Sequence, residues 1–399
     1  MFGFRKRVYL DHASATPVLA EAVAAIARAS DFFANPGGIH AESLAARALL
    51  EKSRERIAAH CAVKAREIVF ASGLTEANNL AILGFARAQE RVRRTLQGTH
   101  WIVSAIEHAS VLECFSEIER MGGEVSHVAP DSGGCITPEA IATLLRKETL
   151  FVSVGWANNE IGVVQPLSAI ARVLKEHERR HGTCVMLHTD AGQAPLYVPP
   201  QPHTLGVDMM SVGSGKLYGP RGIAYLFVSA RTALAPVLLG GGQERGLRAG
   251  TEDVALASGF AVALDVVSRE RSAERDRLRI LRDTLATGIR SAVPEAVVNG
   301  DLKHALPHML NISIPRINAE YLVLLLDRAG FALSTKSACR EGDADSHVVA
   351  ALGGADWRAR NTLRMSLGRS TTAKDLSRMM RVCAACVAKA ENIVAGDPS

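Results

Sequence analysis

An acidic residue and a lysine each follow an apolar segment of this sequence. Asp190 lies in the run 188–193, and Lys216 stands in the glycine-rich turn 213–220. A lysine amine can form a Schiff base with pyridoxal phosphate (PLP), and a carboxylate can hold the protonated ring nitrogen of that cofactor. Asp190 and Lys216 together therefore predict a PLP site.

The turn before Lys216 has two other interpretations. A nucleotide phosphate loop needs glycine at the position of Met210 and serine or threonine at that of Leu217, so this pattern fails at both ends. A surface lysine beside a turn would explain the segment if it stood alone. The other motifs of the chain favour the PLP interpretation.

A second candidate for cofactor binding is the turn 72–76, which follows an apolar segment and precedes an expected helix. Free backbone amides at Leu74 and Thr75, the helix dipole and the Thr75 hydroxyl suit a phosphate group. A plain helix start with Glu76 in its first turn explains the segment equally well. The choice depends on the rest of the site.

Composition indicates a globular chain without an obvious nucleic-acid or membrane partner. The 399 residues are 48% hydrophobic, and 46 basic against 41 acidic residues give a net charge of +5 with the signs interspersed. Neither a membrane-length apolar run nor room for a signal sequence is found. We expect a cytoplasmic protein.

The seven cysteines are odd in number and scattered, which indicates reduced thiols rather than a disulfide framework. Cys383 and Cys386 form a C-x-x-C pattern within a long expected helix. We interpret them as small buried residues rather than as a metal or redox site, and we expect no metal.

Strand-like segments alternate with helical patterns through the first two thirds of the chain, which favours an α/β fold with a mostly parallel sheet. In such sheets, ligands bind at the carboxyl ends of the strands. A long helical stretch over 251–292 predicts a link to a smaller α+β domain. The predicted division is a large cofactor domain, 16–264, and a small domain formed by 1–15 and 265–399.

Several motifs in the same order resemble those of the cysteine desulfurases of iron-sulfur cluster assembly, within the class V aminotransferase group of the fold-type I PLP enzymes. They span about Val8 to Arg369 and are the segments 9–17, 35–36, 72–76, 107–108, 158–162, 188–193, 240–251, 337–339 and 363–369, with Lys216.

The resemblance implies roles around the cofactor. Lys216 would bind PLP covalently, His108 would stack on its ring, and Asp190 would hold the ring nitrogen. Asn159 and Gln193 match residues on the side of the phenolic oxygen. The turn at Leu74 and Thr75 would bind the phosphate.

The resemblance also implies partners and substrate contacts. Thr251 matches a residue that reaches the phosphate of a neighbouring subunit, which predicts a homodimer. Arg364 matches the arginine that grips the carboxylate of L-cysteine, with Asn35 assisting; a planar guanidinium suits this task.

Cys339 would be the catalytic nucleophile. A lone cysteine is more often a buried apolar residue, but its surroundings are polar, and Lys336 and Arg340 favour the thiolate. By resemblance, the Cys339 thiolate attacks the substrate sulfur, alanine is released, and the persulfide passes to an acceptor protein that the sequence does not identify.

The chain departs from the family where Gly213 and Gly215 replace serine and histidine before the lysine. Ser214 would supply a shifted hydroxyl, and we expect weaker cofactor retention. The alternatives to a desulfurase are a selenocysteine lyase or another class V PLP enzyme, and a low-activity sulfur-transfer scaffold.

Overall fold

A seven-stranded sheet forms the centre of the larger part of the computed structural model, which describes residues 7–335 and 345–394. The strand order is β2-β8-β7-β6-β5-β3-β4, and only β8 runs against its neighbours. The predicted α/β fold with a mostly parallel sheet is confirmed. The strands are β2 (Ile68–Ala71), β3 (His100–Ser104), β4 (Glu124–Val128), β5 (Thr149–Ser153), β6 (Met186–Asp190), β7 (Met209–Gly213) and β8 (Ala224–Val228).

Side chains alternate between two buried apolar clusters on opposite faces of this sheet, as the twofold periodicity of a strand requires. Val69 and Trp101 lie in the cluster beneath α3 and α4, whereas Ile68 and Ile102 lie in the other. The helices of this part are α1 (Ala20–Ala29), α2 (Ala41–Cys61), α3 (Leu74–Arg93), α4 (Ala109–Arg120), α5 (Pro138–Leu144), α6 (Leu167–His181) and α7 (Pro202–Leu205), with short 3-10 turns η1 (Ala65–Glu67), η2 (Ala194–Leu196), η3 (Ser214–Lys216) and η4 (Gln243–Gly246).

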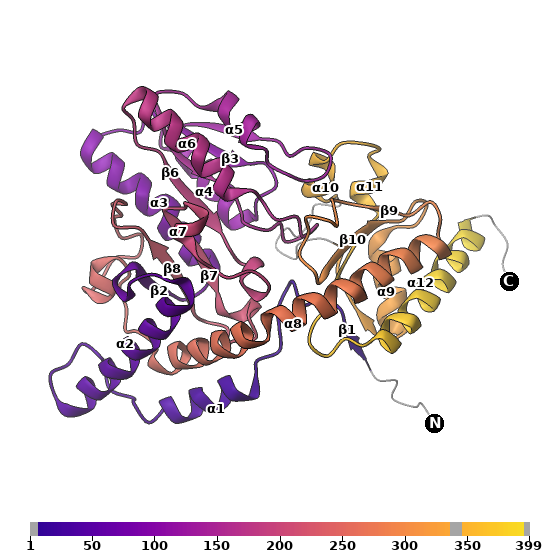
Figure 1. Cartoon of the computed structure of the whole chain (residues 1–399), viewed down its shortest axis with the longest axis horizontal. Helices are drawn as coiled ribbons and strands as arrows, with labels where there is room; N and C mark the ends of the chain where they lie inside the picture. Colours follow the sequence, from indigo (N-terminus) through magenta and orange to yellow (C-terminus); the bar gives the residue numbers. More distant parts are fainter. Residues whose placement is uncertain (1–6, 336–344, 395–399) are drawn as a thin grey trace.

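The long helix α8 (Val254–Ala292) runs from beneath the large sheet to the smaller sheets (Figure 1). It crosses residue 264 without interruption, and the division into domains there stays a prediction. The remaining strands are β1 (Val8–Tyr9), β9 (Val297–Val298), β10 (Met309–Ser313), β11 (Phe331–Ala332) and β12 (Thr362–Ser366), and the remaining helices are α9 (Ala319–Arg328), α10 (His347–Ala351), α11 (Trp357–Arg360) and α12 (Ala373–Val394).

The N-terminal strand β1 belongs to one of these smaller sheets. β1 pairs in parallel with β11, and Asp11 forms a bridge with Ser366 at the end of β12. Cys383 is buried and Cys386 half-buried on α12. Within the described ranges, no helix is long and apolar enough to cross a membrane.

A buried ion pair anchors the segment 240–251 to the large sheet. Arg54 of α2 donates two hydrogen bonds of 2.7 Å to the two carboxylate oxygens of Glu244. The same carboxylate accepts the Phe70 amide of β2 at 2.9 Å. Glu244 adopts a positive φ of 47°, so this contact holds a backbone conformation that side chains disfavour.

We therefore expect Arg54→Met to destabilise the protein by about 3–5 kcal/mol, because it leaves the Glu244 charge buried without its partner. Arg180→Met is the matched control, since the Arg180 pair with Glu176 is exposed and worth less than about 1 kcal/mol. Denaturant unfolding of both variants measures the difference. Equal losses of unfolding free energy would contradict the assignment.

Candidate active site

A cavity opens at the carboxyl ends of the parallel strands. Asp190 is the last residue of β6, and Lys216 ends the turn η3 that follows β7. The cavity is lined by five residues that the sequence predicted for the site: His108, Asn159, Asp190, Gln193 and Lys216. The fold thus brings together residues from widely separated segments.

The Asp190 carboxylate is held by a donor on each oxygen. Its Oδ1 accepts the Gly192 amide at 2.8 Å, and its Oδ2 accepts Asn78 Nδ2 at 2.7 Å. Asn78 is fully buried on α3. These two hydrogen bonds fix the orientation of the Asp190 carboxylate at the edge of the cavity.

His108 is the N-cap residue of α4. Its Nδ1 accepts the Ser110 amide at 3.1 Å and lies 2.9 Å from Ser110 Oγ. Burial lowers the pKa of His108, with the Asp190 charge opposing this shift and Lys216 adding to it. This shift favours the neutral imidazole.

The glycines before Lys216 allow close packing of the turn. A Cβ on Gly213 would lie 3.1 Å from Leu74 Cβ, and one on Gly215 would lie 3.1 Å from Arg221 Cγ. The Leu74 side chain thus packs on this turn. Ser214 Oγ is buried, has no hydrogen-bond partner among the described residues and does not line the cavity.

The helix α3 starts at Leu74, and Gly73 in the N-cap position provides no side-chain cap. Amides at such an end are suited to an anion. Thr75 lines a second cavity, which His108 also borders. The predicted phosphate turn therefore lies next to the predicted ring site.

Arg364 of β12 is 2% exposed and contacts Asn159, which lines the cavity. Its Nη1 donates to Asn159 O at 2.9 Å, and its Nη2 donates to Asp11 Oδ1 at 2.9 Å and Ser14 Oγ at 2.5 Å. Its buried Nε has no partner within the described part of the chain.

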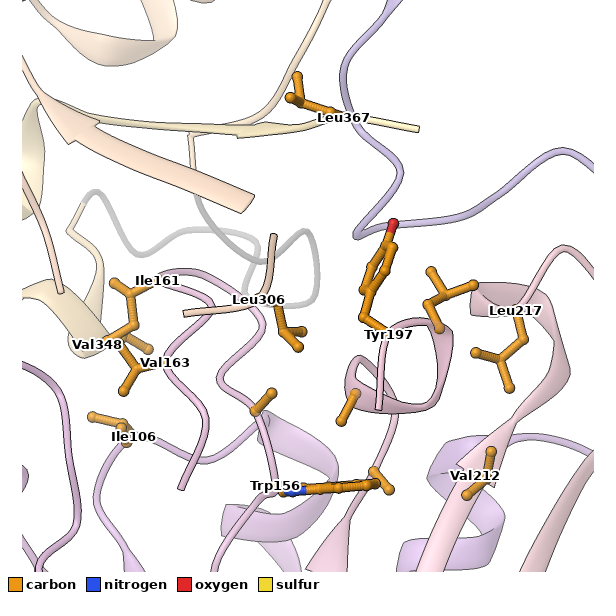
Figure 2. Packing of buried hydrophobic residues seen from close by; sticks show 14 of the residues in the cluster. Ile106, Trp156, Ile161, Val163, Tyr197, Val212, Leu217, Leu306, Val348 and Leu367 are labelled. Carbon is orange, nitrogen blue, oxygen red and sulfur yellow. The ribbon is translucent and has the colours of Figure 1, made fainter. Parts of the chain in front are cut away.

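The segment that begins at residue 345 is held against the loop 158–162. Ser346 Oγ donates to Glu160 Oε2 at 2.5 Å. Val348 of α10 belongs to the same buried apolar cluster as Ile161 and Val163 (Figure 2). The loop that carries Asn159 is thereby fixed against α10.

Among the described residues, Asn35 and Thr251 also do not line this cavity. Asn35 lies in the loop between α1 and α2, where its Oδ1 accepts the Gly37 amide at 2.8 Å. Thr251 lines a separate cavity with Ser72 and Arg248. Cys339 lies outside the described residues. The roles of all three stay predictions.

The sequence interpretation gave no role to Glu107, although it noted the pair Glu107-His108. Its Oε1 accepts the Gly155 amide at 2.7 Å, and burial raises the pKa of the carboxyl to about 8. Glu107 is therefore largely protonated at neutral pH. Asn78, Ser110 and Asp11 were missed too, because their contacts depend on tertiary packing.

Comparisons with known proteins agree on one family. Residues 8–379 match the family described as aminotransferase class V. The chain is 34% identical over 391 residues to "Cysteine desulfurase IscS" of Dictyoglomus turgidum, covering 98% of this chain and 96% of the relative. It is 36% identical over 376 residues to "Cysteine desulfurase IscS 1" of Archaeoglobus fulgidus, covering 94% and 95%.

Solved structures share the fold over nearly the whole chain. A "NIFS-LIKE PROTEIN" superposes with a TM-score of 0.88 at 29% identity, covering 96% of this chain and 100% of the other. The structure "SspA in complex with cysteine" has a TM-score of 0.76 at 32% identity, covering 90% and 98%.

Proposed function

Since this chain belongs to the cysteine desulfurases of the class V aminotransferase family, we propose that it binds PLP at Lys216 and transfers the sulfur of L-cysteine to Cys339. The observation that carries the proposal is the single cavity that joins Lys216, Asp190 and His108. These residues supply an amine, a carboxylate and a flat neutral ring at one place.

The residues present fit the cofactor that the family implies. Lys216 would attach it, the doubly hydrogen-bonded Asp190 carboxylate would meet its ring nitrogen, and the uncapped start of α3 at Leu74 would meet its phosphate. PLP, when bound, withdraws electrons from the α-carbon of an amino acid. Asn159, Gln193 and Thr75 border the same region.

Two side chains carry out the remaining steps of the proposed reaction. The Lys216 amine takes the α-proton of L-cysteine as a general base. The Cys339 thiolate attacks the substrate sulfur, so that an S–S bond forms and the C–S bond breaks. The electrons of the broken bond stay with the carbon fragment, which leaves as alanine after protonation, and a persulfide remains on Cys339.

Arg364 would hold the substrate carboxylate, as the family resemblance implies, from its place beside Asn159 at the edge of the cavity. Asp11 and Ser14 fix the orientation of the guanidinium group before substrate arrives. Because the guanidinium group is already ordered, it loses little conformational entropy when a ligand binds. Asn35 is proposed to assist at the same carboxylate.

The proposed oligomeric state, location and sulfur acceptor follow from the resemblance to the family. We propose a homodimer in which Thr251 reaches the phosphate of the neighbouring subunit, a cytoplasmic location, and a sulfur-acceptor protein in iron-sulfur cluster assembly or thiolation. The proposed domains are 16–264 and 1–15 with 265–399, and the small domain carries Cys339.

The direct test is product release by the purified holoenzyme from L-cysteine in the presence of a thiol reductant. We expect alanine and sulfide in equal amounts, because each turnover breaks one C–S bond and the reductant frees the persulfide sulfur. Chromatography for alanine and a colorimetric sulfide assay measure both. Pyruvate or keto-acid products in place of alanine would contradict the proposal.

A further inference from the structure

A chain of hydrogen bonds connects the Asp190 carboxylate with the His108 ring. Asn78 Nδ2 donates to Asp190 Oδ2 at 2.7 Å and to Ser110 Oγ at 3.0 Å. Ser110 Oγ lies 2.9 Å from His108 Nδ1, and the Ser110 amide donates to the same nitrogen at 3.1 Å. The chain joins α3, α4 and the end of β6.

The direction of every bond in this chain is fixed by chemistry. A carboxylate only accepts, so the NH₂ group of Asn78 must face Asp190. The same NH₂ group donates to Ser110 Oγ, and the single hydroxyl hydrogen of Ser110 is left for His108 Nδ1. Because a backbone amide also only donates, Nδ1 must be an unprotonated acceptor.

We propose that Asn78 and Ser110 are positioning residues that hold His108 in the tautomer with its proton on Nε2 and link that ring to the Asp190 carboxylate. The inference deepens the proposed function, on which it rests for the role of His108 at the cofactor. Its consequence is that only Nε2 can exchange a proton during turnover.

The surroundings of His108 are compatible with this role. The charged and titratable groups facing it are Asp190 from β6, Lys216 from η3, Glu160 from the loop 158–162 and His347 from α10. Burial is the largest cause that lowers its pKa. The two Ser110 donors at Nδ1 also lower the pKa of His108. A proton on Nδ1 would point at the Ser110 N–H and O–H groups and be repelled by them.

This arrangement predicts the direction in which each substitution shifts the pKa of His108. Ser110→Ala removes one donor that stabilises the neutral ring, so the pKa of His108 rises and protonation begins at higher pH. Ser110→Thr keeps the hydroxyl and restores the original titration. Asn78→Ala frees the Ser110 hydroxyl to turn away and shifts the titration in the same direction as Ser110→Ala.

The experiment records ¹H–¹⁵N spectra of the full-length holoenzyme labelled at its histidine rings, with His108→Gln to assign the signals. Nitrogen shifts distinguish an acceptor Nδ1 from a protonated one. We expect wild-type His108 to show an acceptor Nδ1 and Ser110→Ala to titrate at higher pH. Ser116→Ala on the same helix, where the hydroxyl bonds Leu112 O, is the matched control and should titrate as wild type.

A protonated Nδ1 in the neutral wild-type ring, or identical titrations of Ser110→Ala and Ser116→Ala, would overturn the proposal. The spectra are recorded without L-cysteine, so they report on the tautomer whether or not the protein releases sulfide. Failure of the proposed function is seen only in the product assay. The two outcomes are therefore separable.

Discussion

Lys216→Ala is expected to abolish sulfide and alanine release and to remove the visible absorption that survives desalting of the wild-type protein. In the proposed mechanism, the Lys216 amine is both the attachment point for the cofactor and the base for the α-proton. The lost general base alone lowers the rate by roughly 10²–10⁴-fold. Absorption spectra before and after desalting, followed by the product assay, measure both effects.

Lys175→Ala provides the control for this prediction, because Lys175 is an exposed residue on α6, whereas Lys216 lines the central cavity. The control should keep the absorption band and the turnover of the wild type. A Lys216→Ala protein that retains a desalting-resistant band and normal turnover would show that PLP is attached elsewhere.

Cys339→Ser should keep the cofactor absorption and lose essentially all desulfuration of L-cysteine. Serine has no sulfur to form a persulfide, and its hydroxyl is far less ionised than a thiol at neutral pH. Mass spectrometry after L-cysteine treatment without reductant should find one added sulfur on Cys339 of the wild type. The variant should show none.

Cys184→Ser is the matched control, because Cys184 is an exposed thiol beside Arg231. It should release sulfide at the wild-type rate. Sulfide release that persists in Cys339→Ser would indicate a lyase of the selenocysteine type, which can release its product without a thiol. A protein that binds no PLP at all would favour the sulfur-transfer scaffold.

The main features of the fold follow from patterns that the sequence displays. Apolar segments that alternate with helical patterns in the sequence correspond to β2, β3, β5, β6 and β8, and the helical patterns of 41–61 and 167–181 correspond to α2 and α6. The reversed direction of β8 was not predicted, because strand direction depends on the connection and not on side-chain periodicity. β4 was also not predicted, since its side chains are largely polar.

The site likewise contains residues that the sequence predicts and residues that it does not. Asp190 and Lys216 were predictable because a strand end and a following turn place them at one edge of a parallel sheet. Asn78 was not, because its role depends on how α3 packs over β6. Asp11 and Arg364 are separated by 353 residues, and only the β1 and β12 contacts bring them together.

The N-terminal segment has a consequence for how the protein becomes functional as it is made. Asp11 and Ser14 bond Arg364, Gln193 donates to Ala13 O, and Thr16 contacts Gly215 and Tyr218. The segment 11–16 therefore has no contact with Arg364 until β12 has been synthesised. Because these contacts need residue 364, a nascent chain that has not reached β12 lacks the oriented guanidinium group of the proposed substrate site.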